Sequence, residues 1–251
     1  MEKKYNHLTI SFVDDADICR VLSCDKDAVD VVIPRVVDNH LVIAIKDNAF
    51  KDCKKLKSVT FEDVDELPKA LYMPSIDYEI GSYAFSGCSS LKKIHLPKYV
   101  KRIGRSAFYN CTSLKSATFH ACDVDEYAFS HCELLKKVSK INDVREGVFS
   151  YCKSLEYLPI GNKASYIGEE AFYHCYGLTD ITIPKNIIRI EGLAFRSCYN
   201  MKSITFEKPN GWKFRSAYTL ESRETDFSDP VKNVKLAKID FDDGVIEFYR
   251  F

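Results

Sequence analysis

A frame of phenylalanine, cysteine and leucine recurs seven times in this chain, and it limits the possible folds more than any other feature. In each copy Cys stands three residues after Phe, and Leu (Met in the last copy) stands three residues after Cys. The copies begin at Phe50, Phe85, Phe108, Phe129, Phe149, Phe172 and Phe195. A unit as short as the interval between two successive phenylalanines cannot bury its own apolar face. The copies are therefore expected to stack as a repeat solenoid.

Each copy continues into a stretch that alternates apolar and polar side chains, as in Ile94-His95-Leu96 and Ile181-Thr182-Ile183. This period of two predicts a strand with one buried face. Adjacent copies should pair these strands in parallel, about 4.8 Å apart. Because the turns around Phe are bulkier than strands, we expect the sheet on the concave side of an arc. Short helical Ala-Phe-x-x-Cys turns are expected on the convex side.

The fourth copy, which begins at Phe129, departs from the pattern. Lys140 stands where the other copies carry an apolar residue, and Ile141 is the nearest side chain that could replace it. A local slip or bulge would bring Ile141 inward. We therefore expect irregular stacking at this copy.

Seven of the ten cysteines occupy the same slot of the repeat, which indicates small buried side chains with free thiols. Metal binding is not predicted. His131-Cys132 and His174-Cys175 place two ligand types side by side, but neighbouring residues on a turn point in different directions. No cofactor motif is present, and no phosphate-binding or nucleophile motif either.

Charge and hydropathy argue against several classes of function. The 36 basic residues balance the 36 acidic ones, which argues against a nucleic-acid partner. No stretch approaches the ~20 apolar residues of a membrane span, and the first residues do not form a signal peptide. The acidic residues Asp123, Asp125 and Glu126 flank the apolar Val124, so we expect them to project outward as solvated charges without an acid–base role.

The frame also predicts the domain organisation. Residues 29–206 should form one array, because stacked copies share a continuous core. A solenoid needs its terminal coils covered. We expect residues 1–28 to form an N-terminal cap and the aromatic-rich residues 207–251 to form a C-terminal cap.

The copies resemble the BspA-type (Treponema-type) leucine-rich repeats of bacterial and protist surface proteins. The likeness is strongest in residues 94–114, IHLPKYVKRIGRSAFYNCTSL. This resemblance implies a right-handed leucine-rich-repeat β-solenoid, or horseshoe, with roles in adhesion or protein binding. It supplies no catalytic residue. It also implies a secreted or cell-surface location, whereas the start of the chain, read as complete, favours the cytoplasm.

The outward face of the predicted strands is the candidate binding surface. Its central column reads Thr60, His95, Thr118, Ser139, Pro159, Thr182 and Thr205. The residues proposed to bind are Lys93, His95, Thr118, His120, Lys137, Tyr157, Asp180 and Thr182. A second interpretation remains open, in which stacked Thr side chains only stabilise the sheet.

The sequence therefore predicts a non-catalytic module that recognises a protein partner, with adhesion at a cell surface as one use. An intracellular scaffold or regulatory binder is the alternative, favoured by the many apparently unoxidised cysteines. A carbohydrate binder is less well supported, because such a site needs clustered carboxylates or exposed aromatic rings on one face. The oligomeric state is not predicted.

Overall fold

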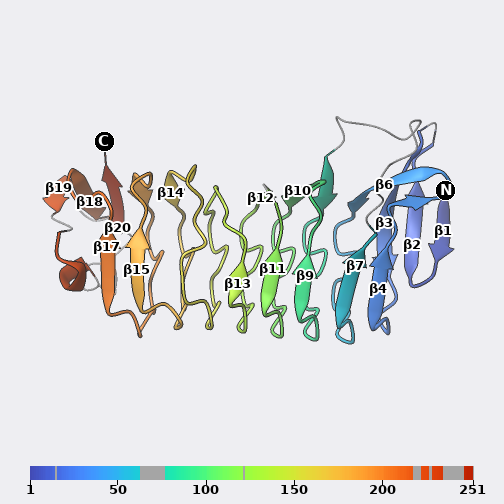
Figure 1. Cartoon of the computed structure of the whole chain (residues 1–251), viewed down its shortest axis with the longest axis horizontal. Helices are drawn as coiled ribbons and strands as arrows, with labels where there is room; N and C mark the ends of the chain where they lie inside the picture. The colour runs from blue at the N-terminus through green and yellow to red at the C-terminus, as the bar shows by residue number, and fades with distance from the viewer. Residues whose placement is uncertain are drawn as a thin grey trace.

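The computed structural model describes residues 1–14, 16–62, 77–120, 122–216, 222–225, 228–233 and 246–250. The chain winds into a row of coils that lie side by side along the long axis, with the termini at opposite ends (Figure 1). Two sets of parallel strands run along this row. The predicted repeat solenoid is confirmed.

The first set of strands follows the Leu or Met of six copies, as predicted, and one further strand precedes the first copy. The described residues directly after Leu155 of the fifth copy form no strand. The set contains β4 (Asp30–Ile33), β7 (Ser58–Phe61), β9 (Lys93–His95), β11 (Ser116–Thr118), β13 (Lys137–Val138), β15 (Asp180–Ile183) and β17 (Ser203–Phe206). The strands pair in parallel as β4–β7, β9–β11–β13 and β15–β17. In β15 the side chains of Asp180 and Thr182 are exposed, whereas those of Ile181 and Ile183 are buried. This alternation confirms the period-two prediction.

The second set of strands precedes each Phe, where the sequence indicated only an extended aliphatic stretch. It contains β3 (Ile18–Cys24), β6 (His40–Ile45), β8 (Tyr78–Ile80), β10 (Val100–Ile103), β12 (Asp123–Val124), β14 (Tyr166–Ile167) and β16 (Arg189–Ile190). β3, β6, β8, β10 and β12 form a continuous parallel series, and β14 pairs with β16. The short β5 (Val36–Val37) pairs with β6. The coils are therefore joined by two sheets.

Antiparallel strands lie at both ends of the row (Figure 1). β1 (Glu2–Tyr5) pairs with β2 (Leu8–Phe12), which in turn pairs with β3. At the other end β20 (Ile246–Arg250) pairs with β16 and with β18 (Trp212–Ser216), which pairs with β19 (Ser222–Thr225). Trp212 is buried, with its ring centroid 5.1 Å from that of Phe206. The cap boundaries at residues 28 and 207 stay predictions.

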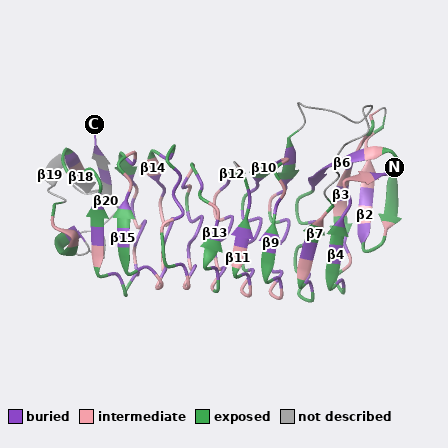
Figure 2. Cartoon of the chain, viewed as in Figure 1, coloured by how far each residue is buried: buried purple, intermediate pink, exposed green. Residues whose placement is uncertain are grey.

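The seven frame phenylalanines form one row of rings through the core. Their side chains are at most 4% exposed. The centroids of successive rings are 4.6 to 5.8 Å apart, and the ring planes are within 22° of parallel. Each ring thus buries its faces against the coils before and after it. Figure 2 shows the resulting buried interior along the length of the array.

The frame cysteines are buried beside this row, as predicted, and all ten cysteines are free thiols. In six coils the Cys thiol donates a hydrogen bond of 3.1 to 3.2 Å to the carbonyl oxygen of the Phe in the preceding coil. The slot therefore needs a small apolar side chain that also carries a donor. Cysteine meets both needs.

The turns after Phe are not the short helices that the sequence indicated. The residue two places after each Phe has a positive φ, between 56° and 75°. These residues are Asp52, Gly87, Asn110, His131, Tyr151, His174 and Ser197. A helix cannot continue through a left-handed residue. In the part of the chain that the structure describes, α-helix occurs only at residues 230–233, and no helix could cross a membrane.

The fourth copy is irregular, as predicted. Lys140 is exposed, and Ile141 is buried in its place. β13 is only two residues long, and Ile141 meets the next coil through a single bridge to Ile160. The first sheet is therefore interrupted between β13 and β15.

Candidate functional site

The outward side chains of the first strand set, β4 to β17, form an exposed surface that we name the recognition face. All eight residues predicted to bind are exposed. Lys93 and His95 lie on β9, Thr118 lies on β11 with His120 just beyond its end, Lys137 lies on β13, Tyr157 lies on the coil without a strand, and Asp180 and Thr182 lie on β15. Whether they bind a partner stays a prediction.

Three of these residues meet. The Nδ1 atom of His95 and the hydroxyl oxygen of Thr118 are 2.8 Å apart and share a hydrogen bond. The rings of His95 and His120 lie edge to face, with centroids 6.5 Å apart. The parallel pairing of β9 with β11 sets His95 opposite Thr118, so this cluster follows from the strand register.

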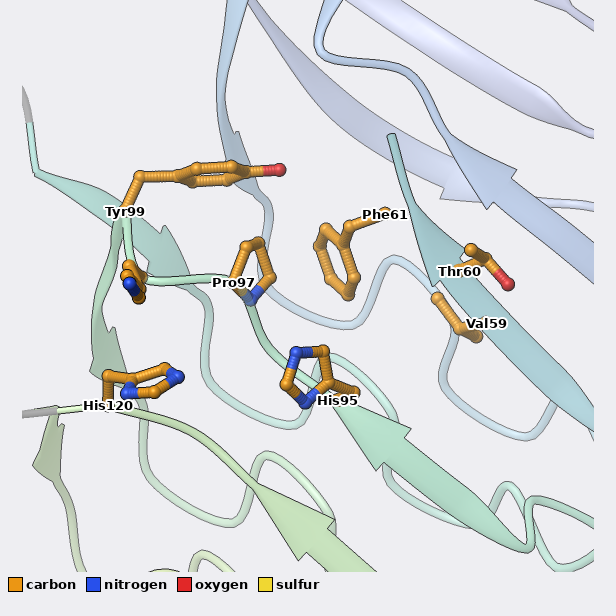
Figure 3. Close-up of a pocket in the computed structure, with 8 residues that line it drawn as sticks. Val59, Thr60, Phe61, His95, Pro97, Tyr99 and His120 are labelled. Carbon is orange, nitrogen blue, oxygen red and sulfur yellow. The ribbon is translucent and has the colours of Figure 1, made fainter. Parts of the chain in front are cut away.

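The cluster borders a hollow of about 380 Å³ on the recognition face. Figure 3 shows the rings of Phe61, Pro97 and Tyr99 around the same space as His95 and His120. Thr60 and Lys98 also line it. The hollow therefore combines apolar rings with imidazole, ammonium and hydroxyl groups, a composition suited to holding one side chain of a partner.

Arg35 supports the wall of the hollow from behind. Its guanidinium carbon is 3.9 Å from the centroid of the Tyr99 ring, and its Nη1 donates a hydrogen bond of 2.9 Å to the carbonyl oxygen of Val42. The Tyr99 hydroxyl donates to the carbonyl oxygen of Glu62 at 3.3 Å. A cation over a ring and a bonded hydroxyl hold the Tyr99 side chain in place. The wall is thus formed before any partner arrives.

The sequence did not single out Phe61, Tyr99 or Arg35 for the site. Phe61 stands at an apolar strand position, which predicts a place in the core, but it is only partly buried. Tyr99 and Arg35 stand on connections outside the repeat columns. The sequence did hold one signal for the hollow. Phe61 and Tyr99 place a bulky ring at or shortly after a predicted strand in two neighbouring copies, close to His95 and His120.

Tyr157 has a structural role beside any role in binding. Its hydroxyl donates to the carbonyl oxygen of Val138 at 2.7 Å and accepts from the Val138 amide at 3.0 Å. The side chain thereby satisfies two backbone groups of β13 at the interruption of the sheet. Pro159, predicted in the outward column, is buried in this irregular coil, so that prediction was wrong.

The Ser139 side chain also satisfies two backbone groups of a neighbouring coil. Its hydroxyl accepts from the Phe119 amide at 2.9 Å and donates to the Phe119 carbonyl at 2.8 Å. On β15 the Asp180 carboxylate accepts a hydrogen bond of 2.6 Å from the Ser203 hydroxyl. Ser139 of the central column therefore bonds to the neighbouring coil, whereas the stacking of the Thr side chains stays a prediction.

The second sheet carries an ion-pair cluster around Asp125. This carboxylate is only 6% exposed and pairs with Arg102 and Arg145, each with a nitrogen–oxygen distance of 2.8 Å. The expectation that Asp125 is an ordinary solvated charge was wrong. Arg102 comes from the coil before Asp125 and Arg145 from the coil after it, and their two charges offset the burial of the carboxylate.

The described residues contain no group of three or more His, Cys, Asp or Glu side chains that could hold a metal ion. The histidines next to frame cysteines do not form such a group. His174 contacts tyrosine rings and shares a hydrogen bond of 2.5 Å between its Nδ1 and the Tyr176 hydroxyl, whereas the neighbouring thiol of Cys175 is turned into the core.

Comparisons with solved structures place the fold among bacterial leucine-rich repeat proteins. A leucine-rich cell surface protein from Faecalibacterium prausnitzii is 29% identical with a TM-score of 0.67, over 84% of this chain and 56% of that one. This chain therefore spans little more than half of that protein. A leucine-rich repeat protein from T. pallidum is 22% identical with a TM-score of 0.52, over 82% of this chain and 84% of that one, a likeness of fold.

No curated protein matches the chain. The chain does match the description of one protein family. The BspA type leucine-rich repeat region matches in six copies, over residues 32–69, 69–146 and 123–238. These ranges cover most of the chain and include all seven copies of the Phe-Cys-Leu frame. The chain belongs to the BspA-type leucine-rich repeat family, whose repeats are generally non-catalytic.

Proposed function

We propose that this chain is a non-catalytic recognition module that binds a protein partner through the recognition face. The observation that carries the proposal is the hollow, where His95 and His120 face the rings of Phe61 and Tyr99. Such a site offers a partner both an apolar anchor point and hydrogen-bonding groups. The flat row of exposed strands beside it supplies the wider contact area that a protein interface needs.

The location that fits this function is a cell surface, where the module would serve adhesion. Support comes from the F. prausnitzii relative, which is described as a cell surface protein. Antibody labelling of intact and permeabilised host cells tests this location. Signal from intact cells supports it, and signal only after permeabilisation supports the intracellular scaffold instead.

A photo-crosslinking comparison tests the proposed face. A photoreactive amino acid is placed at Thr118 or Thr182 on the recognition face, and at Glu79 or Lys101 on the second sheet as matched controls. All four side chains are exposed on strands. Illumination in the native host should give a discrete protein adduct from the first pair only.

Adducts from Glu79 or Lys101 alone would contradict the proposed face. Adducts from none of the four positions, with the labelled protein folded and present, would leave the second interpretation, in which the hydroxyl column only stabilises the sheet.

A further inference from the structure

The three central strands of the recognition face, together with the residues that flank them, carry basic side chains and no acidic ones. Segments 92–98, 115–120 and 136–140 surround β9, β11 and β13 and contain no Asp or Glu. They contain two histidines, His95 and His120, and a set of lysines: Lys92, Lys93, Lys98, Lys115, Lys136, Lys137 and Lys140. In a chain whose total charges balance, this face is a local basic patch.

Most of these lysines have no ionic partner among the residues that the structure describes. Lys136 pairs with Glu156, with a nitrogen–oxygen distance of 3.3 Å. Within the described part of the chain, none of the other lysines of the patch forms an ion pair, although lysines elsewhere do, such as Lys153 with Glu133 at 2.8 Å. Unpaired ammonium groups on one face favour a partner of opposite charge.

The strand register spaces these charges regularly. Ser116 of β11 stands opposite Lys93 of β9 on one side and Lys137 of β13 on the other. Neighbouring strands are about 4.8 Å apart, which places the Cα atoms of Lys93 and Lys137 about 10 Å from each other. Two carboxylates of an extended segment can bridge that separation. Ser116 therefore stands between the two lysines.

The hollow favours a peptide over a sulfated glycan. It opens on the patch, and Phe61, Pro97 and Tyr99 give it an apolar wall. A sulfated glycan carries negative charge but no bulky aliphatic or aromatic group for this wall, whereas a nucleic acid has aromatic bases, so the test below includes an oligonucleotide. A peptide can carry both groups in one segment.

We propose that the partner segment on this patch is an acidic peptide with a large apolar side chain, which enters the hollow while its carboxylates face Lys93 and Lys137. This inference rests on the proposed function and specifies its partner. The acidic groups at the borders of the patch, Glu62, Glu156 and Asp180, limit the segment to the central coils because they repel its carboxylates.

The test uses the whole chain and fluorescent synthetic peptides. One peptide is rich in Glu with a single central Phe, a second has Gln in place of Glu, and a third has Gly in place of Phe. Anisotropy is measured at about 50 mM and about 300 mM salt, since screening weakens exposed charge pairs. The variants are Lys93→Glu with Lys137→Glu, and Lys46→Glu with Lys163→Glu as the control. The control lysines are also exposed, and they change the net charge equally.

We expect the Glu peptide with Phe to bind best and to weaken with salt. The Lys93 and Lys137 variant should bind it at least about tenfold more weakly, and the control should stay within about twofold of wild type. Equal weakening in both variants would mean non-specific attraction and would overturn the inference. So would tighter binding of a heparin fragment or an oligonucleotide that the peptide cannot displace.

Failure here is separable from failure of the proposed function. If no peptide binds while crosslinks still form at Thr118 and Thr182, the acidic partner is wrong and the recognition face stands. If no crosslink forms there either, both are wrong.

Discussion

The thiol of Cys111 donates a hydrogen bond to the carbonyl oxygen of Phe85, 26 residues earlier, at a distance of 3.1 Å. That carbonyl also accepts from the Cys88 amide of its own coil at 3.1 Å. The contact links two successive coils at the place where their rings stack. It explains why the frame pairs Phe with Cys, since Ala or Val in the slot would have no donor.

Removing this thiol should destabilise the protein. Cys111→Ala is expected to lower the free energy of unfolding by ~1–2 kcal/mol, through a small cavity and the lost hydrogen bond. Cys111→Val fills the slot with a somewhat larger side chain that has no donor. A loss of stability in both variants therefore points to the hydrogen bond, and a loss in Cys111→Ala alone points to the cavity. Both are measured by urea denaturation. An unchanged midpoint for both variants would mean that the thiol contributes neither packing nor a hydrogen bond.

The thiols should be unreactive in the folded protein. Burial raises the pKa of Cys111, Cys152 and Cys175 well above the ordinary value, and it raises the pKa of the partly exposed Cys122 to about 11. Because the frame thiols are buried, a disulfide reagent at about pH 8 should modify them only after unfolding. This includes Cys53, whose pKa is lowered by a hydrogen bond with Cys24. Cys122 should be the first to react. Rapid modification of several thiols in the native protein, or few free thiols after denaturation without reductant, would contradict this account.

The hydroxyl of Tyr157 should contribute to stability at the sheet interruption. Tyr157→Phe leaves the amide and carbonyl of Val138 without their side-chain partner, and we expect a loss of ~1–2 kcal/mol. Tyr83→Phe is the matched control, because Tyr83 is similarly exposed and its hydroxyl makes no hydrogen bond within the described residues. Thermal and urea unfolding measure both variants. An equally small loss of unfolding free energy in both variants would contradict a stabilising role for the Tyr157 hydroxyl.

Stability should fall between neutral and mildly acidic pH because of two histidines on the turn edge. Burial lowers the pKa of His131 and of His174 below 6.5, and the nearby Lys153 ammonium adds to the effect for both. The unfolded chain therefore binds more protons as the pH drops below about 6.5, and stability decreases through the lower folded pKa values. The urea midpoint is compared at about pH 7.5 and about pH 5.5 in wild type and in a His131→Gln, His174→Gln variant. The same pH dependence in both would assign the effect to other groups.

The core of this fold could be predicted from the sequence because it repeats. A frame such as Phe108 with Cys111 and Leu114 occurs in phase seven times, and only stacking buries all copies together. The slip at Lys140 and Ile141 was visible for the same reason, as a break in a regular column. The left-handed turn residues were not, since Asn110, His131 and Tyr151 share no side-chain chemistry that marks a positive φ.

The candidate site was only half predictable. Period two gives the outward direction of His95 and Thr118, and the strand register then brings them together. The hollow depends on Tyr99 and on Arg35 behind it, which belong to connections between strands and come from coils far apart in sequence. The repeat pattern does not predict the contact between Arg35 and Tyr99, because neither residue belongs to a repeat column.

The most direct test of the central claim, that successive coils stack like on like, is a double-mutant cycle on the ring row. Phe108 and Phe129 are stacked neighbours with centroids 5.3 Å apart, whereas Phe50 and Phe195 belong to the first and last copies. Each single Ala variant at the central pair should cost ~3–5 kcal/mol in unfolding free energy. Denaturation should give a coupling of ~0.5–1.5 kcal/mol for Phe108 with Phe129, and none for Phe50 with Phe195. Additive effects within the neighbouring pair, or small single losses, would contradict the stacked array and the recognition face that it supports.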